Sequence, residues 1–188
     1  MEIKTHRTVL GIDPGTTVLG YSVVRFDGIK LELLVMGVME LKKYSDHYIK
    51  LGKIFDRVDT VIKEFNPEEL SIESPFFGKN VQSMLKLGRA QGVAMAAAIK
   101  NGLPIFEYAP REIKTAVTGS GSATKEQVAN ILKIELQIRE MPVYMDASDA
   151  LGAAVCHIYR TKIAKTVKTK KTAGNWNDFL KNNPDRIK

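Results

Sequence analysis

The strongest constraint on this chain is an aspartate that directly follows a strand of apolar residues. Residues 8–12 read Thr-Val-Leu-Gly-Ile, an apolar and β-branched run that predicts a strand buried on both faces. Asp13 comes next, and the Pro-Gly pair after it cannot continue a β ladder and favours a turn. A buried carboxylate persists when it is paired or bound to a metal ion. Asp13 alone leaves two interpretations open, a metal ligand or a simple turn cap.

Hydrophobic periodicity divides the rest of the chain into strands and helices. Five strands are predicted, over residues 8–12, 19–26, 31–41, 70–73 and 104–108. Helices are predicted over residues 48–65, 81–100 and 146–160, with a short helix or turn at 110–117 and a further helix that begins at the capping box of Thr124 and Gln127 and ends at Met141 and Pro142. The expected fold class is α/β, with a mixed five-stranded sheet flanked by helices.

A second carboxylate closes the short strand at residues 70–73. This strand follows a helix, so a right-handed crossover places it parallel to the first strand. Its last residue is Glu73. We therefore expect Glu73 and Asp13 to lie at the same end of neighbouring strands.

Two further acids, Asp146 and Asp149, stand three residues apart at the start of the last predicted helix. Like charges at this spacing share one helix face and are favoured near a helix N-terminus. One interpretation is a cap at Asp146 with an exposed Asp149, and the other is a pair of metal ligands. If the helix packs against the sheet edge, four carboxylates converge. Hard cations such as Mg²⁺ neutralise such a cluster, and two ions about 4 Å apart suit phosphodiester hydrolysis.

One line of the helix at residues 81–100 carries the small residues Gly88, Gly92 and Ala96. Small residues four apart let another backbone approach closely. Packing against the sheet is the more common arrangement, and contact with a second subunit is the alternative.

The net charge of +7 is unevenly distributed along the chain. Residues 76–125 hold 7 basic and 2 acidic side chains, a net +5, and residues 161–188 hold 8 and 2, a net +6. Basic zones separated from acidic ones suit a nucleic acid backbone. We expect one domain over residues 1–160 and a basic, flexible C-terminal tail over residues 161–188.

The apolar runs are shorter than the roughly 20 residues that a membrane-spanning helix needs. The N-terminus has no signal-peptide core, so the expected location is cytoplasmic. The single cysteine, Cys156, lies in an apolar stretch and indicates neither an internal disulfide nor a zinc site.

In order along the chain, these motifs closely resemble the RuvC family of Holliday junction resolvases, which have a ribonuclease H-like fold. The resemblance covers most of residues 8–160 and rests on residues 11–15 with 20–21, 72–73 with 76 and 79–80, 85–94, 106–108, 114, 119–125 and 146–151. It implies a magnesium-dependent homodimer that nicks two strands of four-way junction DNA symmetrically and cooperates with the RuvA and RuvB branch-migration proteins.

The resemblance also implies roles for individual residues. The metal-binding catalytic acids would be Asp13, Glu73, Asp146 and Asp149. The DNA contacts would be Phe76, Lys79, Arg89, Lys114 and Lys125, with the last two beside the scissile phosphate and Phe76 against bases at the crossover. The lysine-rich tail lies outside the resemblance.

Three other functions are weighed against this one. The turn at residues 13–17 resembles the phosphate loop of actin and sugar-kinase ATPases, but those proteins hold nucleotide between two such domains and this chain has the length of one. A noncatalytic DNA-binding module would leave the four carboxylates without a role. A ribonuclease H-like nuclease with another substrate, such as an RNA-DNA hybrid, is the third.

Overall fold

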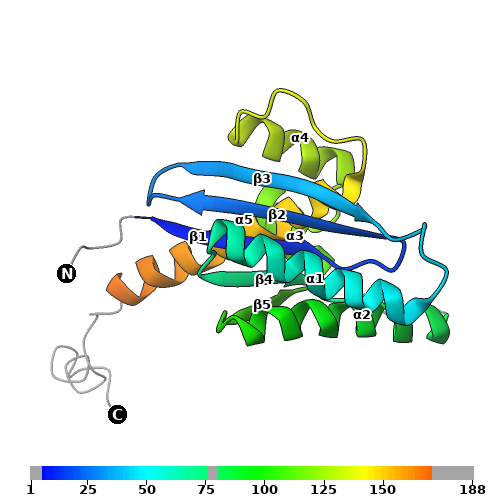
Figure 1. Cartoon of the computed structure of the whole chain (residues 1–188). Coiled ribbons are helices and arrows are strands. Elements are labelled where there is room, and N and C mark those ends of the chain that lie inside the picture. The colour runs from blue at the N-terminus through cyan, green and yellow to red at the C-terminus, as the bar shows by residue number, and fades with distance from the viewer. Residues whose placement is uncertain (1–5, 76–79, 171–188) are drawn as a thin grey trace, which may run out of the picture. The chain divides into compact units, whose positions relative to one another are not determined.

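A mixed five-stranded sheet forms the centre of the protein. The computed structural model describes residues 6–75 and 80–170, with side chains as far as Lys162 (Figure 1). The strands are β1 (Arg7–Asp13), β2 (Val18–Phe26), β3 (Leu31–Glu40), β4 (Glu69–Glu73) and β5 (Ile105–Tyr108). They are arranged in the order β3-β2-β1-β4-β5. The pairs β1–β2 and β2–β3 are antiparallel, while β4 is parallel to both β1 and β5. The predicted mixed sheet and crossover are confirmed.

One face of the sheet is covered by α1 (His47–Phe65) and α2 (Val81–Lys100), which lie side by side. Local signals set their ends, because the side chains of Asp46 and Asn80 accept hydrogen bonds from backbone N–H groups of the first turns. The core beneath them is apolar and fully buried, and it includes Leu10, Ile12, Leu19, Ile54, Val58, Leu70, Ile72, Ala90 and Ala94.

The small-residue line of α2 points away from this core. Ala90, Ala94, Ala97 and Ala98 are the alanines that α2 buries. Gly88, Gly92 and Ala96 are exposed, and a Cβ added at either glycine would have no atom within 4 Å. The expectation that this line packs against the sheet is therefore wrong. The alanines one or two positions further along the helix pack against the sheet instead. The small-residue line therefore faces outward and can contact another molecule.

The other face of the sheet contacts the first half of α5 (Met145–Lys170), and α3 (Pro110–Thr118) and α4 (Lys125–Glu135) pack together beside it. The approach of α5 is very close. A Cβ added at Gly11 would lie 2.1 Å from the backbone oxygen of Ala150, and one added at Gly20 would lie 1.9 Å from that of Asp146. Both β1 and β2 therefore need glycine where the helix crosses them.

Two helix ends differ from the expectation. α4 ends at Glu135, well before Met141 and Pro142, because Gln137 adopts a left-handed conformation with φ 52°. α5 continues past Arg160 to Lys170. Contacts divide the chain into two units, Met1–Ile158 and Tyr159–Lys188. Among the described helices, none is both long and apolar enough to span a membrane.

Candidate active site

The sheet brings Asp13 and Glu73 together. Ile12 and Ile72 are partners in the parallel β1–β4 ladder, and the two carboxylates are the next residues along these strands. Side chains alternate along a strand, and Ile12 and Ile72 belong to the core under α1 and α2. Asp13 and Glu73 therefore project to the opposite face, which α5 covers.

The first turns of α5 supply Asp146 and Asp149 to the same region. Gly20 is the register partner of Asp13, and its missing side chain admits the backbone of Asp146. Both aspartates are half-buried. The strand ends and this helix start thus approach one another in the fold, although the three segments are far apart in sequence.

Electrostatics show how strongly these acids interact. Burial, followed by the negative charges of Glu73, Asp149 and Asp146, raises the pKa of Asp13 to about 8. Burial and the charge of Asp149 raise the pKa of Glu73 to about 7. The causes are desolvation and like charge, both of which disfavour the ionised form. Without a cation, this cluster holds protons that ordinary carboxyl groups have lost at neutral pH.

Two lysines border the carboxylates. Lys125, the first residue of α4, forms an ion pair with Asp149, and Lys114 of α3 acts electrostatically on Glu73. A small hollow of about 40 Å³ is lined by these four side chains and by Pro110, Ile113 and Val128. Lys125 therefore reaches the carboxylates themselves. Sequence spacing gives no sign of this pair, because the two residues meet only through the packing of α4 beside α5.

The donor set fits a hard divalent cation. All four acids offer oxygen atoms, and the raised pKa values of Asp13 and Glu73 reflect charge that a cation would neutralise. In the parts of the chain with described side chains, no three His, Cys, Asp or Glu residues are grouped closely enough to form a complete ion site. The ammonium of Lys125 is the positive charge bound to Asp149.

Among the remaining predicted DNA contacts, Arg89 lies away from the carboxylates. Arg89 is exposed on α2 and, with Val81, Met84, Leu85 and Gly88, lines a shallow apolar hollow. It belongs to the helix layer on the other side of the sheet from Asp13. Phe76 and Lys79 fall outside the described residues.

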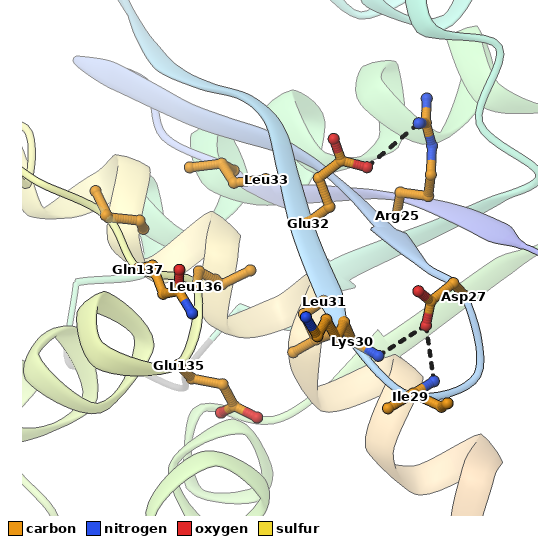
Figure 2. Close-up of a pocket in the computed structure, with 11 residues that line it drawn as sticks. Arg25, Asp27, Ile29, Lys30, Leu31, Glu32, Leu33, Glu135, Leu136 and Gln137 are labelled. Carbon is orange, nitrogen blue, oxygen red and sulfur yellow. Dashed lines mark hydrogen bonds and ion pairs between the residues drawn. The ribbon is translucent and has the colours of Figure 1, made fainter.

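A larger hollow, of about 700 Å³, is lined by residues around the end of β2 (Figure 2). The carboxylates lie near the start of this strand, where Gly20 is the register partner of Asp13. The β2–β3 hairpin and the segment after α4 form the walls of the hollow. Three of its charged groups have protein partners. Arg25 pairs with Glu32 at 3.2 Å, and Asp27 accepts hydrogen bonds from the backbone of Ile29 and Lys30. It shares no residue with the carboxylate cluster.

Comparison with known proteins identifies the family. A family model described as "Crossover junction endodeoxyribonuclease RuvC" matches residues 9–157. The chain belongs to the RuvC family. A protein of that name from Cytophaga hutchinsonii is 56% identical over 182 residues, covering 97% of this chain and 88% of the relative. The RuvC of Bacteroides fragilis is 53% identical over 185 residues, and the match covers 97% of this chain and 97% of that protein.

Solved structures agree with this assignment. Thermus thermophilus RuvC in complex with a Holliday junction substrate is 34% identical, with a TM-score of 0.79 over 84% of this chain and 96% of that one. The yeast mitochondrial Holliday junction resolvase Ydc2 is 15% identical, with a TM-score of 0.60 over 84% of this chain and 80% of that one, which shows a shared fold. The expected RuvC resemblance and the ribonuclease H-like fold class are confirmed.

Proposed function

We propose that this RuvC protein is a crossover junction endodeoxyribonuclease, which resolves four-way DNA junctions by hydrolysing phosphodiester bonds in two strands. The observation that supports the proposal is the electrostatic effect of Glu73, Asp146 and Asp149 on Asp13, in a chain that belongs to the RuvC family. The relatives that match almost the whole chain bear the same enzyme name. This supports junction cleavage over the ATPase and the noncatalytic DNA-binding module.

The four carboxylates would hold divalent metal, as membership of a metal-dependent nuclease family implies. Mg²⁺, in two copies, is the finer proposal, because all the donors are oxygen atoms and magnesium also binds substrate phosphate. When bound, the ions would activate water and stabilise the leaving oxygen. The residues of the chain orient the site, since β1 and β4 hold two ligands rigidly and α5 brings the other two.

Lys114 and Lys125 would bind the DNA phosphate next to the cut. Both are within electrostatic range of Glu73, so a phosphate bound by them lies beside the acids. Lys125 is paired with Asp149 in the DNA-free protein. If Asp149 held a cation, the Lys125 ammonium would be available for a phosphate oxygen. Phe76, Lys79 and Arg89 remain proposed DNA contacts of lower priority.

A homodimer would explain how two strands are cut together, because a junction has approximate two-fold symmetry. The candidate interface is the exposed α2 face with Gly88, Gly92 and Ala96 and the apolar hollow beside it. Val81 and Leu85 on the same helix are 66% and 51% exposed, which is unusual for side chains of this size. Gly92→Leu should shift the protein towards monomer in sedimentation, whereas Gly52→Leu on α1 should not.

In the cell, the enzyme would act in the cytoplasm with RuvA and RuvB, which move the branch point along the DNA. Cleavage would leave a 5′-phosphate and a 3′-hydroxyl that a ligase can rejoin. These expectations come from the family alone.

The deciding experiment incubates the purified protein with a synthetic four-way junction, the matching duplex and an RNA-DNA hybrid, each with and without MgCl₂. Paired cuts near the crossover, only with the cation and only in the junction, are the expected result. Asp13→Asn, Glu73→Gln, Asp146→Asn and Asp149→Asn should each still bind the junction but cleave it at least about a hundredfold more slowly. The matched control is Asp56→Asn, which neutralises an exposed carboxylate on α1. Preferential cutting of the hybrid would contradict the proposal.

A further inference from the structure

A buried polar cluster joins α5 to three strands of the sheet at a distance from the carboxylates. His157 of α5 has no exposed surface. Its Nδ1 lies 2.7 Å from the hydroxyl of Tyr108 on β5, and its Nε2 lies 3.1 Å from Glu69 Oε2 on β4. The guanidinium of Arg7 on β1 pairs with the same Glu69 carboxylate and lies 2.5 Å from Nε2. We call Arg7, Glu69, Tyr108 and His157 the His157 cluster.

Either tautomer of His157 leaves both ring nitrogens with a partner. With the proton on Nε2, the ring donates to Glu69 and accepts from the Tyr108 hydroxyl, but the Arg7 guanidinium, which can only donate, then faces an N–H group. With the proton on Nδ1, the ring donates to Tyr108 and accepts from Arg7. The ring of Phe106 packs against the imidazole with centroids 4.2 Å apart. The imidazole is therefore fixed in both position and rotation.

The acidic member of the cluster is held as a carboxylate. Burial by itself would raise the pKa of Glu69, but hydrogen bonds from His157 and Arg7 outweigh this and hold it below the usual value. A carboxylate that accepts from two directions at once is a strong anchor. Glu69 is the first residue of β4, and Glu73 is the last residue of that strand.

The His157 cluster is the last of four points at which one line of α5 meets the sheet. The backbone oxygens of Asp146 and Ala150 lie over Gly20 and Gly11, and that of Ala153 accepts a 2.6 Å hydrogen bond from Ser71 Oγ. Positions 146, 150, 153 and 157 are spaced four, three and four apart, so they share one face of the helix. The two glycine contacts are steric and allow sliding. The contacts of Ser71 and His157 are directional, and they fix the helix along and around its axis.

We propose that His157 is a positioning residue, whose attachment to Glu69 and Tyr108 sets the axial and rotational place of α5 and hence the places of Asp146 and Asp149 beside Asp13 and Glu73. The inference rests on the proposed role of these four acids as metal ligands. The attachment points are well placed for this, because Tyr108 is the register partner of Glu73 in the β4–β5 ladder. The pair β4 and β5 thus carries both the proposed metal ligand Glu73 and the attachment points of α5, the helix that carries the ligands Asp146 and Asp149.

Three variants separate positioning from simple core packing. His157→Phe keeps an aromatic ring against Phe106 but removes both hydrogen bonds, and His157→Gln restores an amide that can donate to Glu69. Tyr108→Phe removes a single oxygen atom. It is the milder variant to use if the His157 variants do not fold. The matched control is Val155→Ala, which truncates a fully buried apolar side chain of the same helix.

Three measurements are made on each full-length variant below its unfolding midpoint. They are junction affinity without divalent cation, the rise in unfolding midpoint on adding MgCl₂ or MnCl₂ without DNA, and the single-turnover cleavage rate as a function of MgCl₂ concentration. The second readout does not depend on activity.

We expect His157→Phe to bind the junction within about twofold of the wild type. The MgCl₂ concentration for half-maximal cleavage should rise by about tenfold, by analogy with residues that orient metal ligands, and the cation-induced rise in unfolding midpoint should shrink. Tyr108→Phe should show a smaller change in the same direction, and His157→Gln should recover part of the loss. Val155→Ala should lose thermal stability but keep the cation response of the wild type.

Identical cation responses in His157→Phe, Tyr108→Phe and Val155→Ala would overturn the positioning role and leave His157 as a core residue. A wild type that binds cation at these acids but does not cut the junction would instead overturn the proposed function. In that case the shift in unfolding midpoint still tests the placement of the acids by His157.

Discussion

On the face of the sheet under α1 and α2, the layers are separated by large apolar side chains, whereas on the face under α5 the helix backbone lies almost directly on the strands. Leu10 and Ile12 of β1 point to the first face, and Gly11 between them faces Ala150 of α5. The same strand therefore takes part in two kinds of packing. Side-chain packing can relax around a change, but backbone atoms in contact cannot. The rigid face is the one that carries the carboxylates.

The largest loss of stability or activity is expected where a substitution adds a side chain between α5 and the sheet. A methyl group at Gly20 would lie 1.9 Å from the backbone oxygen of Asp146, so Gly20→Ala must displace the start of α5. We expect a stability loss above about 4 kcal/mol, or, if the helix shifts instead, a loss of cleavage of about a hundredfold. Chemical denaturation and junction cleavage measure the two outcomes. A variant with near wild-type stability and activity would show that α5 is not held by this contact.

A large truncation on the other face should affect stability alone. Ile54→Ala removes a fully buried side chain of α1 and should cost about 2–5 kcal/mol. Cleavage per folded molecule should stay within about twofold, because the cavity forms on the far side of the sheet from Asp13. Cleavage assays at a temperature well below the lowered unfolding midpoint test this. A strong loss of activity in the fully folded variant would mean that the faces are coupled.

The carboxylate cluster should make the metal-free protein sensitive to alkaline pH. The pKa of Asp13 is raised from an ordinary 3.8 to about 8, so the folded protein holds this proton more tightly than the unfolded chain does. Stability from this group is fully present below pH 4 and is lost as the pH rises towards 8. Asp13→Asn cannot ionise, and at pH 9 without divalent cation it should exceed the wild type by on the order of a few kcal/mol.

At pH 5 the difference between the two proteins should be smaller than at pH 9, because most of the loss falls between pH 5 and pH 8. Adding MgCl₂ at pH 9 should stabilise the wild type more than Asp13→Asn, since only the wild type gains a charged oxygen ligand. Thermal unfolding at both pH values gives the comparison. A variant that is less stable than the wild type at pH 9 would show that Asp13 is stabilised as an anion by groups other than a metal.

The smallest effect is expected at a glycine that faces solvent. Gly52 lies within α1, and a Cβ added there has no atom within 4 Å. Gly52→Ala should stabilise the protein by up to about 1 kcal/mol, because alanine loses less backbone entropy in a helix. Cleavage should not change. Gly52→Ala adds a methyl group in open space, whereas Gly20→Ala adds the same group between two backbones. The pair of variants therefore compares the two environments directly.

Local sequence determined much of this protein. Short apolar runs located the five strands, a three-four apolar spacing located the main helices, and side-chain caps such as Asn80 marked where helices begin. Asp13 and Glu73 could be placed at neighbouring strand ends because crossover handedness and strand direction follow general rules. Each of these inferences depends on residues within a few positions of each other or on a rule shared by many folds.

The tertiary structure alone decided the contacts between distant elements. The pairing of Lys125 with Asp149, the burial of His157 between Glu69 and Tyr108, and the outward direction of Gly92 leave no local pattern in the sequence. They depend on how far and at what angle a helix crosses the sheet, which packing of the whole core sets. A periodic pattern shows which face of an element is buried, but the partner of each side chain on that face is fixed only when the layers close.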